Sequence, residues 1–374
     1  MGKRWMWTLA AAAALATATA AFWKPAGARL TDLSVYLGAV SGLADGAGLY
    51  DFTRGAAPFT YPPFAALLFT PLTWLPAGVV QIAWTLATLA TVAGLAVLVT
   101  RQPAARSQHV PAAVAALALI LSAPVSSDIK YGQVSLFLAA LVAVDLLALR
   151  RTPGHGALIG LAAAIKLTPL IFIPLLWFAG RRAAAAVATA TFAGCALVGA
   201  ATLPTDSWAF WTDKVFRPDR LGYVDGVGNQ SLNGALLRLG IAAEARSTLV
   251  VAIGGTLAAV ALIRAVGLAR RSDWLAALTV TGAASVILSP VSWTHHQVWL
   301  VLAALLPVAG PAWARAAWRM CVLAVMILPV TALGPPLFSE SRLVLAVAVA
   351  ALVPLATGRE VVTAPVAEPE YAHR

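Results

Sequence analysis

Apolar runs separated by short polar segments fill most of this 374-residue chain. A helix needs about 20 apolar residues to cross a bilayer. Runs near or below that size occur at 5–22, 79–99, 110–123, 133–149, 183–203, 247–268, 274–288, 298–310, 320–334 and 343–357. Two further runs, 63–76 and 156–179, are interrupted by prolines. The pattern predicts an all-α polytopic membrane protein with roughly 10–12 hydrophobic membrane segments. We expect one domain over 1–360 and a short, disordered cytoplasmic tail over 361–374.

Arginines between the apolar runs indicate which connections are cytoplasmic, because cytoplasmic loops are enriched in Lys and Arg. That rule places on the inner side Arg101 and Arg106, Arg150-Arg151, Arg181-Arg182, Arg264 with Arg270-Arg271, Arg315 with Arg319, and Arg359. The connections left for the outer side are 24–60, 124–132, 204–235, 289–297 and 335–341. This parity requires 156–179 to enter the membrane and return, with a break near 166–169.

The composition excludes a soluble globule. Hydrophobic residues make up 60% of the chain and charged residues only 11%, with a mean hydropathy of +0.84, whereas soluble domains carry about 25% charge. The net charge of +11 does not indicate nucleic-acid binding, because the basic residues occur as scattered pairs between apolar runs. Cys195 and Cys321 both lie inside apolar runs, which excludes a disulfide framework or a thiolate metal site. Residues 1–23 resemble a signal peptide, but the many following runs favour an uncleaved first helix.

The segment "TYPPFAALLFTPLTWLP" at 60–76 is too apolar for a loop and too rich in proline for an ordinary helix. Pro62 and Pro63 are suited to start a helix, where no backbone donor is lost, and Pro71 and Pro76 end it. We interpret the segment as an outer-leaflet or re-entrant element that covers a site. A short tilted span, with the parity restored elsewhere, is the alternative.

Carboxylates in the first outer connection are candidates for acid–base chemistry. Asp32 lies just beyond the first apolar run, with Tyr36 one helical turn later, and can take a proton from a hydroxyl at the membrane surface. A solvated aspartate or a helix cap would also explain it. Asp51 is a further polar candidate, whereas Asp45 lies between glycines that predict a turn.

Cations near the outer side are candidates for binding a lipid phosphate. Lys166 has apolar flanks on both sides, and a lysine at the centre of a membrane helix costs about 2.5–3.5 kcal/mol. It either meets a phosphate or pairs with a carboxylate. Arg217 and Arg220 occur close to aromatic residues in the connection 204–235, a composition that suits an anionic lipid interface or an ordinary aromatic belt.

Polar residues in two later connections complete the candidates. His295 and His296 are adjacent and point to different faces, so they are poor joint metal ligands, but either can contact a phosphate. The amides of Asn229, Gln230 and Asn233 suit sugar hydroxyls, although capping and turn formation explain Asn next to Gly equally well.

Five motifs in order give the chain a recognisable pattern: "LTDLSVY…GAGLYDF…FTYPPFAALLFTPLTWLP", "YGQVSLFLAALVAVDLLALRR", "GLAAAIKLTPLIFIPLLWFAGRR", "VGNQSLNGALLR" and "SPVSWTHHQVWLV". From about residue 30 to 300 the chain resembles the polyprenol-phosphate-mannose-dependent alpha-(1→2)-mannosyltransferases of actinobacteria, glycosyltransferase family 87. Each motif alone is weak, but five in order are strong.

The resemblance implies a GT-C fold in the plasma membrane, with the active site facing the periplasmic or extracellular side. It implies transfer of mannose from a polyprenyl phosphate to a hydroxyl of a glycolipid or lipoglycan, with inversion. The family's catalytic aspartate matches Asp32; Ser34 stands where a DxD pair would need a second aspartate, so we expect no metal and no cofactor. Lys166, Arg217, Arg220, His295 and His296 are the candidates to stabilise the leaving phosphate, and Tyr61 lies near the sugar or lipid head.

Two other functions stay open. A carrier or flippase for lipid-linked sugar would show internal repeats and ionisable residues at the bilayer midplane; we find no convincing repeat, and Lys166 alone is of that kind. An inactive assembly subunit is the third possibility. The acceptor and the oligomeric state cannot be read from the residues.

Overall fold

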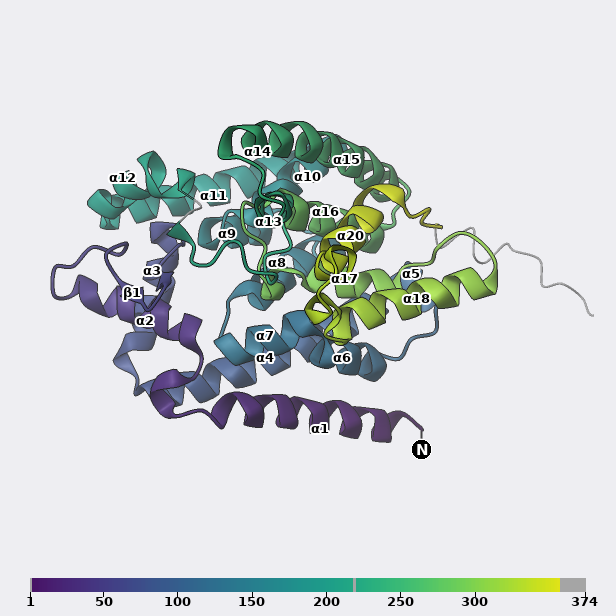
Figure 1. Ribbon diagram of the computed structural model, residues 1–374, viewed down its shortest axis with the longest axis horizontal. Helices are drawn as coiled ribbons and strands as arrows, with labels where there is room; N and C mark the ends of the chain where they lie inside the picture. Colours follow the sequence, from purple (N-terminus) through teal and green to yellow (C-terminus); the bar gives the residue numbers. More distant parts are fainter. Residues whose placement is uncertain (1, 218–219, 357–374) are drawn as a thin grey trace, which may run out of the picture.

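The computed structural model describes residues 2–217 and 220–356, so the tail predicted at 361–374 lies outside the described residues. Helices dominate the described chain (Figure 1), which confirms the predicted all-α class. Among the described residues, the sheet consists of one antiparallel hairpin of β1 (Thr53–Arg54) and β2 (Ala57–Pro58).

The helical elements are short in several places, where 3-10 (η) or π turns interrupt them; η6 and η10 are the π turns. The first half forms α1 (Gly2–Phe22), η1 (Ala26–Ala28), α2 (Thr31–Leu43), α3 (Pro63–Phe69), η2 (Thr70–Trp74), α4 (Ala77–Thr100), α5 (Pro103–Arg106), α6 (Ala112–Leu121), α7 (Ala123–Tyr131), α8 (Ser135–Leu147), α9 (Ala157–Ile165), η3 (Thr168–Ile171) and α10 (Phe172–Phe178). The second half forms α11 (Arg182–Thr202), α12 (Pro204–Thr212), η4 (Lys214–Phe216), α13 (Leu232–Arg238), α14 (Ala243–Leu249), η6 (Val250–Gly254), α15 (Gly255–Arg270), α16 (Trp274–Leu288), η7 (Thr294–His296), α17 (Val298–Leu302), η8 (Ala303–Leu305), α18 (Ala312–Ile327), η9 (Val330–Ala332), α19 (Pro336–Ser339), α20 (Ser341–Val347) and η10 (Ala348–Leu352).

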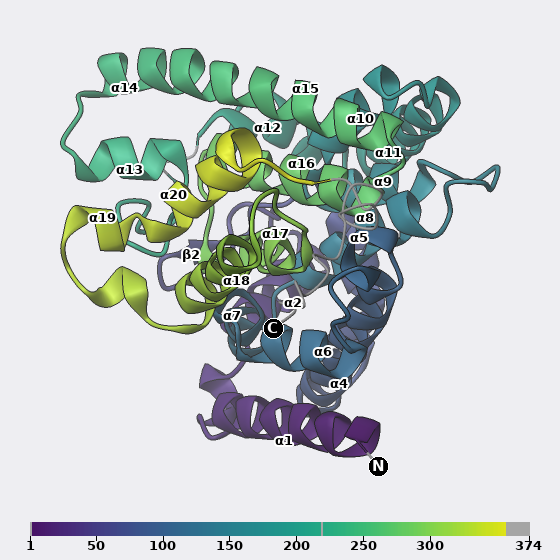
Figure 2. The same ribbon diagram turned by 90° about the vertical axis from the view of Figure 1, so that its right-hand side faces the viewer.

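Within residues 2–217 and 220–356, four helices are long and apolar enough to cross a membrane, at Arg4–Phe22, Ala77–Thr100, Arg182–Thr202 and Ala243–Arg270. The bent pair α6–α7 would make a fifth span. Shorter apolar helices fill the space between them, and α1 and α14–α15 lie on opposite edges of the molecule in both views (Figure 1, Figure 2). This arrangement is that of a polytopic membrane protein.

Proline breaks the run predicted at 110–123. The chain bends by 65° between α6 and α7, because Pro124 has no N–H to continue the helix. Ser122 is extended at the bend (φ −69°, ψ 145°), and its hydroxyl donates to the Leu119 carbonyl at 2.6 Å. Residues assigned to the connection 124–132 are therefore mostly helical, since α7 continues to Tyr131.

A second break lies at Lys166, as the sequence predicted. Helix α9 ends at Ile165, Lys166 is fully extended (φ −151°, ψ 132°), and a new turn begins at Thr168 with Pro169 in its first positions. The extended backbone at Lys166 separates the two helical segments, and its amine contacts His296 rather than a residue of either segment. Whether 156–179 re-enters the membrane stays a prediction.

The segment around the prolines at 62–63 forms a short element. Pro63 begins α3, and α3 with η2 covers only residues 63–74, which at 1.5 Å per residue is about 18 Å, shorter than a hydrocarbon core of about 30 Å. Helix α3 packs on α11 so closely that a Cβ on Gly199 would lie 3.0 Å from the Phe64 nitrogen. Tyr61, at the entrance, is buried.

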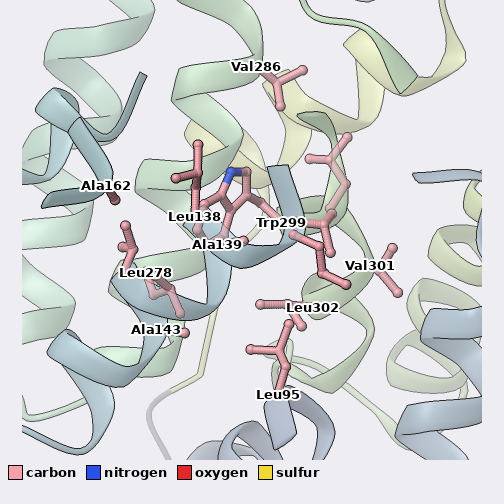
Figure 3. Close-up of a cluster of buried hydrophobic side chains, with 14 of the residues drawn as sticks. Leu95, Leu138, Ala139, Ala143, Ala162, Leu278, Val286, Trp299, Val301 and Leu302 are labelled. Carbon is pink, nitrogen blue, oxygen red and sulfur yellow. The ribbon is translucent and has the colours of Figure 1, made fainter. Parts of the chain in front are cut away.

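The apolar core beneath this region is built from helices that are distant in the sequence. Its closely packed side chains come from α4, α8, α9, α16 and α17 (Figure 3): Leu95, Leu138, Ala139, Ala143, Ala162, Leu278, Val286, Trp299, Val301 and Leu302. Gly282 permits this packing, because a Cβ there would lie 2.4 Å from Trp299 Cγ. The core fixes α8, α9 and α17 relative to one another, and these helices carry or adjoin the polar residues described next.

Candidate active site

Asp32 lies in the first turn of α2. The residue before this helix, Leu30, is fully buried and holds a left-handed conformation (φ 41°, ψ 57°) that is unfavourable for a branched side chain. The surrounding packing must therefore compensate for local strain, a feature that clusters at functional sites. A carboxylate in the first turn is favoured by the helix dipole, and the fold holds it at one defined place.

The carboxylate of Asp32 is bound by the amide of Gln133, whose Nε2 donates to Asp32 Oδ2. The other end of the same amide faces two phenols: Tyr36 donates to Gln133 Oε1 at 2.8 Å and Tyr61 at 3.1 Å. The two phenol oxygens are themselves 2.8 Å apart. Thr31 adds a weak contact of 3.5 Å to Asp32 Oδ1. The structure thus joins Asp32, Tyr36 and Tyr61 in one network.

Burial raises the pKa of Asp32 above its ordinary value, since the charged form is costly to desolvate. The hydrogen bond from Gln133 and then the charge of Lys166 act in the opposite direction. The carboxyl therefore has a raised proton affinity while two neighbours still favour its ionised form. That combination suits a general base.

Lys166 reaches the same site from the break between α9 and η3. Its Nζ lies 2.6 Å from His296 Nε2, 3.5 Å from Ser135 Oγ and 5.4 Å from the centre of the Tyr61 ring. His296 Nδ1 accepts the backbone N–H of Trp293 at 3.1 Å. Lys166 Nζ and His296 Nε2 cannot both donate to each other at this distance, so the protonation of His296 and that of Lys166 depend on each other.

His295 lies directly behind His296. It is 7% exposed, its ring packs edge-to-face on that of His296 at 4.5 Å, and its Nε2 has no hydrogen-bond partner among the described residues. Burial and then the charge of Lys166 lower the pKa of both histidines well below the usual value. Both rings are therefore neutral, polar groups at neutral pH.

A second carboxylate, missed in the sequence, lies behind the network. Asp128 in α7 is 2% exposed; its Oδ2 accepts the Leu136 N–H at 3.0 Å, and its Oδ1 has no partner among the described residues. It lies in the connection predicted at 124–132, and a carboxylate in a connection gives no burial signal. Gln133 begins the predicted apolar run 133–149 and was not singled out as a polar candidate.

A cavity of about 30 Å³ opens beside the Lys166–His296 pair. Apolar side chains such as Leu138, Phe172 and Val286 line it together with the ring of Trp299, and five hydroxyl-bearing residues join them: Ser135, Thr168, Ser285, Ser289 and Ser292. Donors of this kind beside a cation can bind phosphate oxygens. The Oγ of Ser292 is buried with no partner in the described part of the chain, which leaves one donor available.

The predicted sugar-binding amides lie elsewhere and are engaged by the chain itself. Asn229 and Gln230 are fully buried. Asn229 Oδ1 accepts from Ser231 and Ser292, and Gln230 Nε2 donates to the Ser339 carbonyl at 2.7 Å. Asn233 donates to the Pro290 carbonyl at 3.1 Å. These bonds tie the connection 224–234 to its neighbours, a role that needs no ligand.

Three other predicted residues also lie outside the network. Asp51 is exposed and caps its own turn by accepting the Gly48 N–H at 3.1 Å. Arg217 is exposed and pairs with Asp213 at 3.6 Å. Arg220 lies nearer: it donates to the Phe59 carbonyl at 2.8 Å and stacks over the Tyr50 ring, 5.3 Å from its centre. It thereby supports the segment that leads to Tyr61.

Comparison with known proteins identifies the family. The sequence profile of glycosyltransferase family 87 matches residues 59–290. The chain belongs to glycosyltransferase family 87.

Curated relatives in mycobacteria carry more specific names. The chain is 38% identical, over 74% of its length and 69% of the relative's, to a polyprenol-phosphate-mannose-dependent alpha-(1-2)-phosphatidylinositol pentamannoside mannosyltransferase of Mycolicibacterium smegmatis. It is 38% identical, over 66% of its length and 61% of the relative's, to a polyprenol-phosphate-mannose-dependent alpha-(1-2)-phosphatidylinositol mannoside mannosyltransferase of Mycobacterium tuberculosis. The chain thus spans about two thirds of the length of these relatives. No solved structure matches it significantly.

Family 87 membership makes the chain a glycosyltransferase, and the matched residues include Gln133 and Lys166, whereas His295 and His296 follow the matched range. Asp32 precedes the matched range, so its role rests on the geometry around it and stays a prediction. The described residues contain no group of three or more His, Cys, Asp or Glu side chains placed to hold a metal ion. The expectation that the reaction needs no metal stays a prediction.

Proposed function

We propose that this family 87 glycosyltransferase moves mannose from a polyprenyl-phosphate-mannose donor to a hydroxyl of a phosphatidylinositol mannoside or related glycolipid. The reaction takes place on the outer side of the plasma membrane and inverts the anomeric centre. The observation that carries this proposal is the convergence of a base and a cation. The Asp32 carboxylate from α2 is joined through Gln133 to the Tyr61 hydroxyl, and the Lys166 amine from the α9–η3 break lies 5.4 Å from the centre of the same Tyr61 ring.

The geometry supports a single displacement. Asp32 accepts the proton of the acceptor hydroxyl while the oxygen of that hydroxyl forms a bond to the anomeric carbon. The bond from that carbon to the phosphate oxygen breaks, and its electron pair leaves with the polyprenyl phosphate. Lys166 stabilises the negative charge that develops on that phosphate, and His296 and the hydroxyl groups of the neighbouring cavity lie beside it.

The names of the mycobacterial relatives support the choice of donor and acceptor class. The outer location rests on the distribution of arginines between the apolar runs. Both the lipid donor and the lipid acceptor are membrane-bound, which suits a site between short helices close to a membrane surface.

Transfer by the purified protein tests the proposal. The protein in liposomes is given radiolabelled polyprenyl-phosphate mannose and phosphatidylinositol mannosides, and label in the acceptor is measured. We expect label in the acceptor that an alpha-(1→2)-specific mannosidase removes. Label that crosses the bilayer but stays on the donor would instead identify a lipid-linked sugar carrier.

A further inference from the structure

Gln133 reaches α2 because the residue before it is glycine. Gly132 ends α7 in the left-handed region (φ 68°), and a Cβ there would lie 2.9 Å from the Cβ atoms of both Leu30 and Leu33. A glycine is therefore required for the loop between α7 and α8 to approach the start of α2. The approach brings the Gln133 amide against the carboxylate of Asp32.

The phenols of Tyr36 and Tyr61 fix which way this amide points. Burial raises the pKa of both phenols, so each oxygen carries one proton. Either both hydroxyls donate to Gln133 Oε1, or Tyr61 donates to Tyr36, which donates to Oε1. In both arrangements the amide oxygen faces the tyrosines, and the NH₂ group faces Asp32.

The reverse orientation is unfavourable while Asp32 is ionised. It would place the amide oxygen against a carboxylate oxygen and turn NH₂ hydrogens toward two hydroxyls that need an acceptor. Packing also holds the tyrosines in place, because the Tyr36 ring stacks on Phe69 with 4.7 Å between ring centres. The network therefore has one preferred orientation, with the Oδ2 atom of Asp32 occupied by the Gln133 N–H.

We propose, on the basis of the function above, that Gln133 is a positioning residue that selects Oδ1 of Asp32 as the atom that takes the acceptor proton. Oδ2 is shielded from the reaction by a charge-assisted hydrogen bond. Tyr36 and Tyr61 act through Gln133 by holding its amide. Among the residues that the structure describes, Oδ1 has only the weak contact to Thr31, and it is the oxygen left for the sugar hydroxyl.

The same bond tunes the acidity of the base. A hydrogen bond donated to a carboxylate favours its ionised form, and its loss should raise the proton affinity of Asp32. The other charged or titratable groups that act on Asp32 are Lys166, Asp128 and the two phenols. They stay in place when only the Gln133 amide is removed.

The test is the pH dependence of kcat/KM for mannose transfer in three variants. In Gln133→Leu the acid limb should move to higher pH by about one to two units, and kcat should fall about tenfold or more. In Gln133→Glu a second carboxyl beside Asp32 should move the limb further. Gln102→Leu is the matched control: it removes another buried amide, which donates to the Leu98 carbonyl, and should leave the profile unchanged.

A parental rate and profile in folded Gln133→Leu, together with an inactive Asp32→Asn, would overturn the role of Gln133 and leave the proposed function intact. An active Asp32→Asn would overturn the base assignment itself. If Gln133→Leu does not accumulate, the double variant Tyr36→Phe/Tyr61→Phe decides. It keeps both rings and Gln133, and should still move the acid limb upward by a smaller amount; an unshifted limb at the parental rate would refute the proposal.

Discussion

Replacing Asp32 by Asn removes the proton acceptor and little else. The Asn carbonyl oxygen can take the place of Oδ2 and accept from Gln133, and its NH₂ group can face the Thr31 hydroxyl, which now lies 3.5 Å from Oδ1. The side chain is only half-buried at this position, so no packing is lost. The variant should therefore fold and bind both lipids.

The loss should appear in the rate of transfer. General base catalysis by a positioned side chain contributes about 10²–10⁴-fold, which corresponds to roughly 3–5 kcal/mol of activation free energy. The upper part of this range is expected here, because Asp128 cannot replace Asp32. Asp128 is 2% exposed, and its Oδ2 already accepts the Leu136 N–H.

The assay is single-turnover transfer of radiolabelled mannose in liposomes, with folding checked by gel filtration. Asp273→Asn is the matched control. Asp273 caps α16 by accepting the Ala276 N–H at 3.1 Å, a role that Asn fills equally well, so its transfer rate should equal that of the parent. A folded Asp32→Asn protein within threefold of the parental rate would refute the reasoning.

Three further predictions follow from the site and its proposed orientation. Lys166→Met keeps the length of the side chain but removes its contact with His296 and its charge; the donor KM should rise or kcat should fall by about 10- to 150-fold, and parental kinetics would return Lys166 to a structural role. Because burial raises the pKa of Asp32, kcat/KM should decline as the pH falls through a value above the ordinary 3.8; a decline centred at or below 3.8 would contradict a raised pKa of the base. A single cysteine at Asp213 should react with an impermeant thiol reagent in intact cells and one at Thr152 should not; the opposite pattern would reverse the orientation.

The sequence predicted the class of fold because burial in a membrane is a local property. Runs of apolar residues mark the helices, and proline marks their ends; the break at Lys166 was predicted in this way and is confirmed. The boundaries were less accurate. The run at 298–310 is helical only to Leu305, because Leu306 precedes Pro307 and is extended (φ −85°, ψ 135°).

The site was predicted in part. Asp32, Tyr36, Tyr61, Lys166 and His296 do converge in the structure. Lys166 could be singled out because an ionisable residue with apolar flanks is costly in a membrane, and the others because they lie in or beside predicted outer connections. Their convergence itself was not predictable, because separate helices contribute them.

Gln133 and Asn229 show what the sequence could not decide. Both are amides that directly follow a glycine, and neither residue type reveals which partner the side chain meets. Gln133 donates to the carboxylate of Asp32, whereas the side chain of Asn229 forms its hydrogen bonds with backbone groups of its own connection and of residue 292.

The sequence by itself determined that the chain is a helical membrane protein and, through its ordered motifs, its family; both depend on residue type and spacing. Only the tertiary structure decided which polar groups meet, since hydrogen bonds join residues far apart in the chain, 130 positions for Lys166 and His296 and 211 for Gln108 and Arg319. The physical reason lies in the range of the forces. Hydrophobic partition acts on each segment separately, whereas a hydrogen bond requires two atoms within about 3 Å, and only the packed helices supply that proximity.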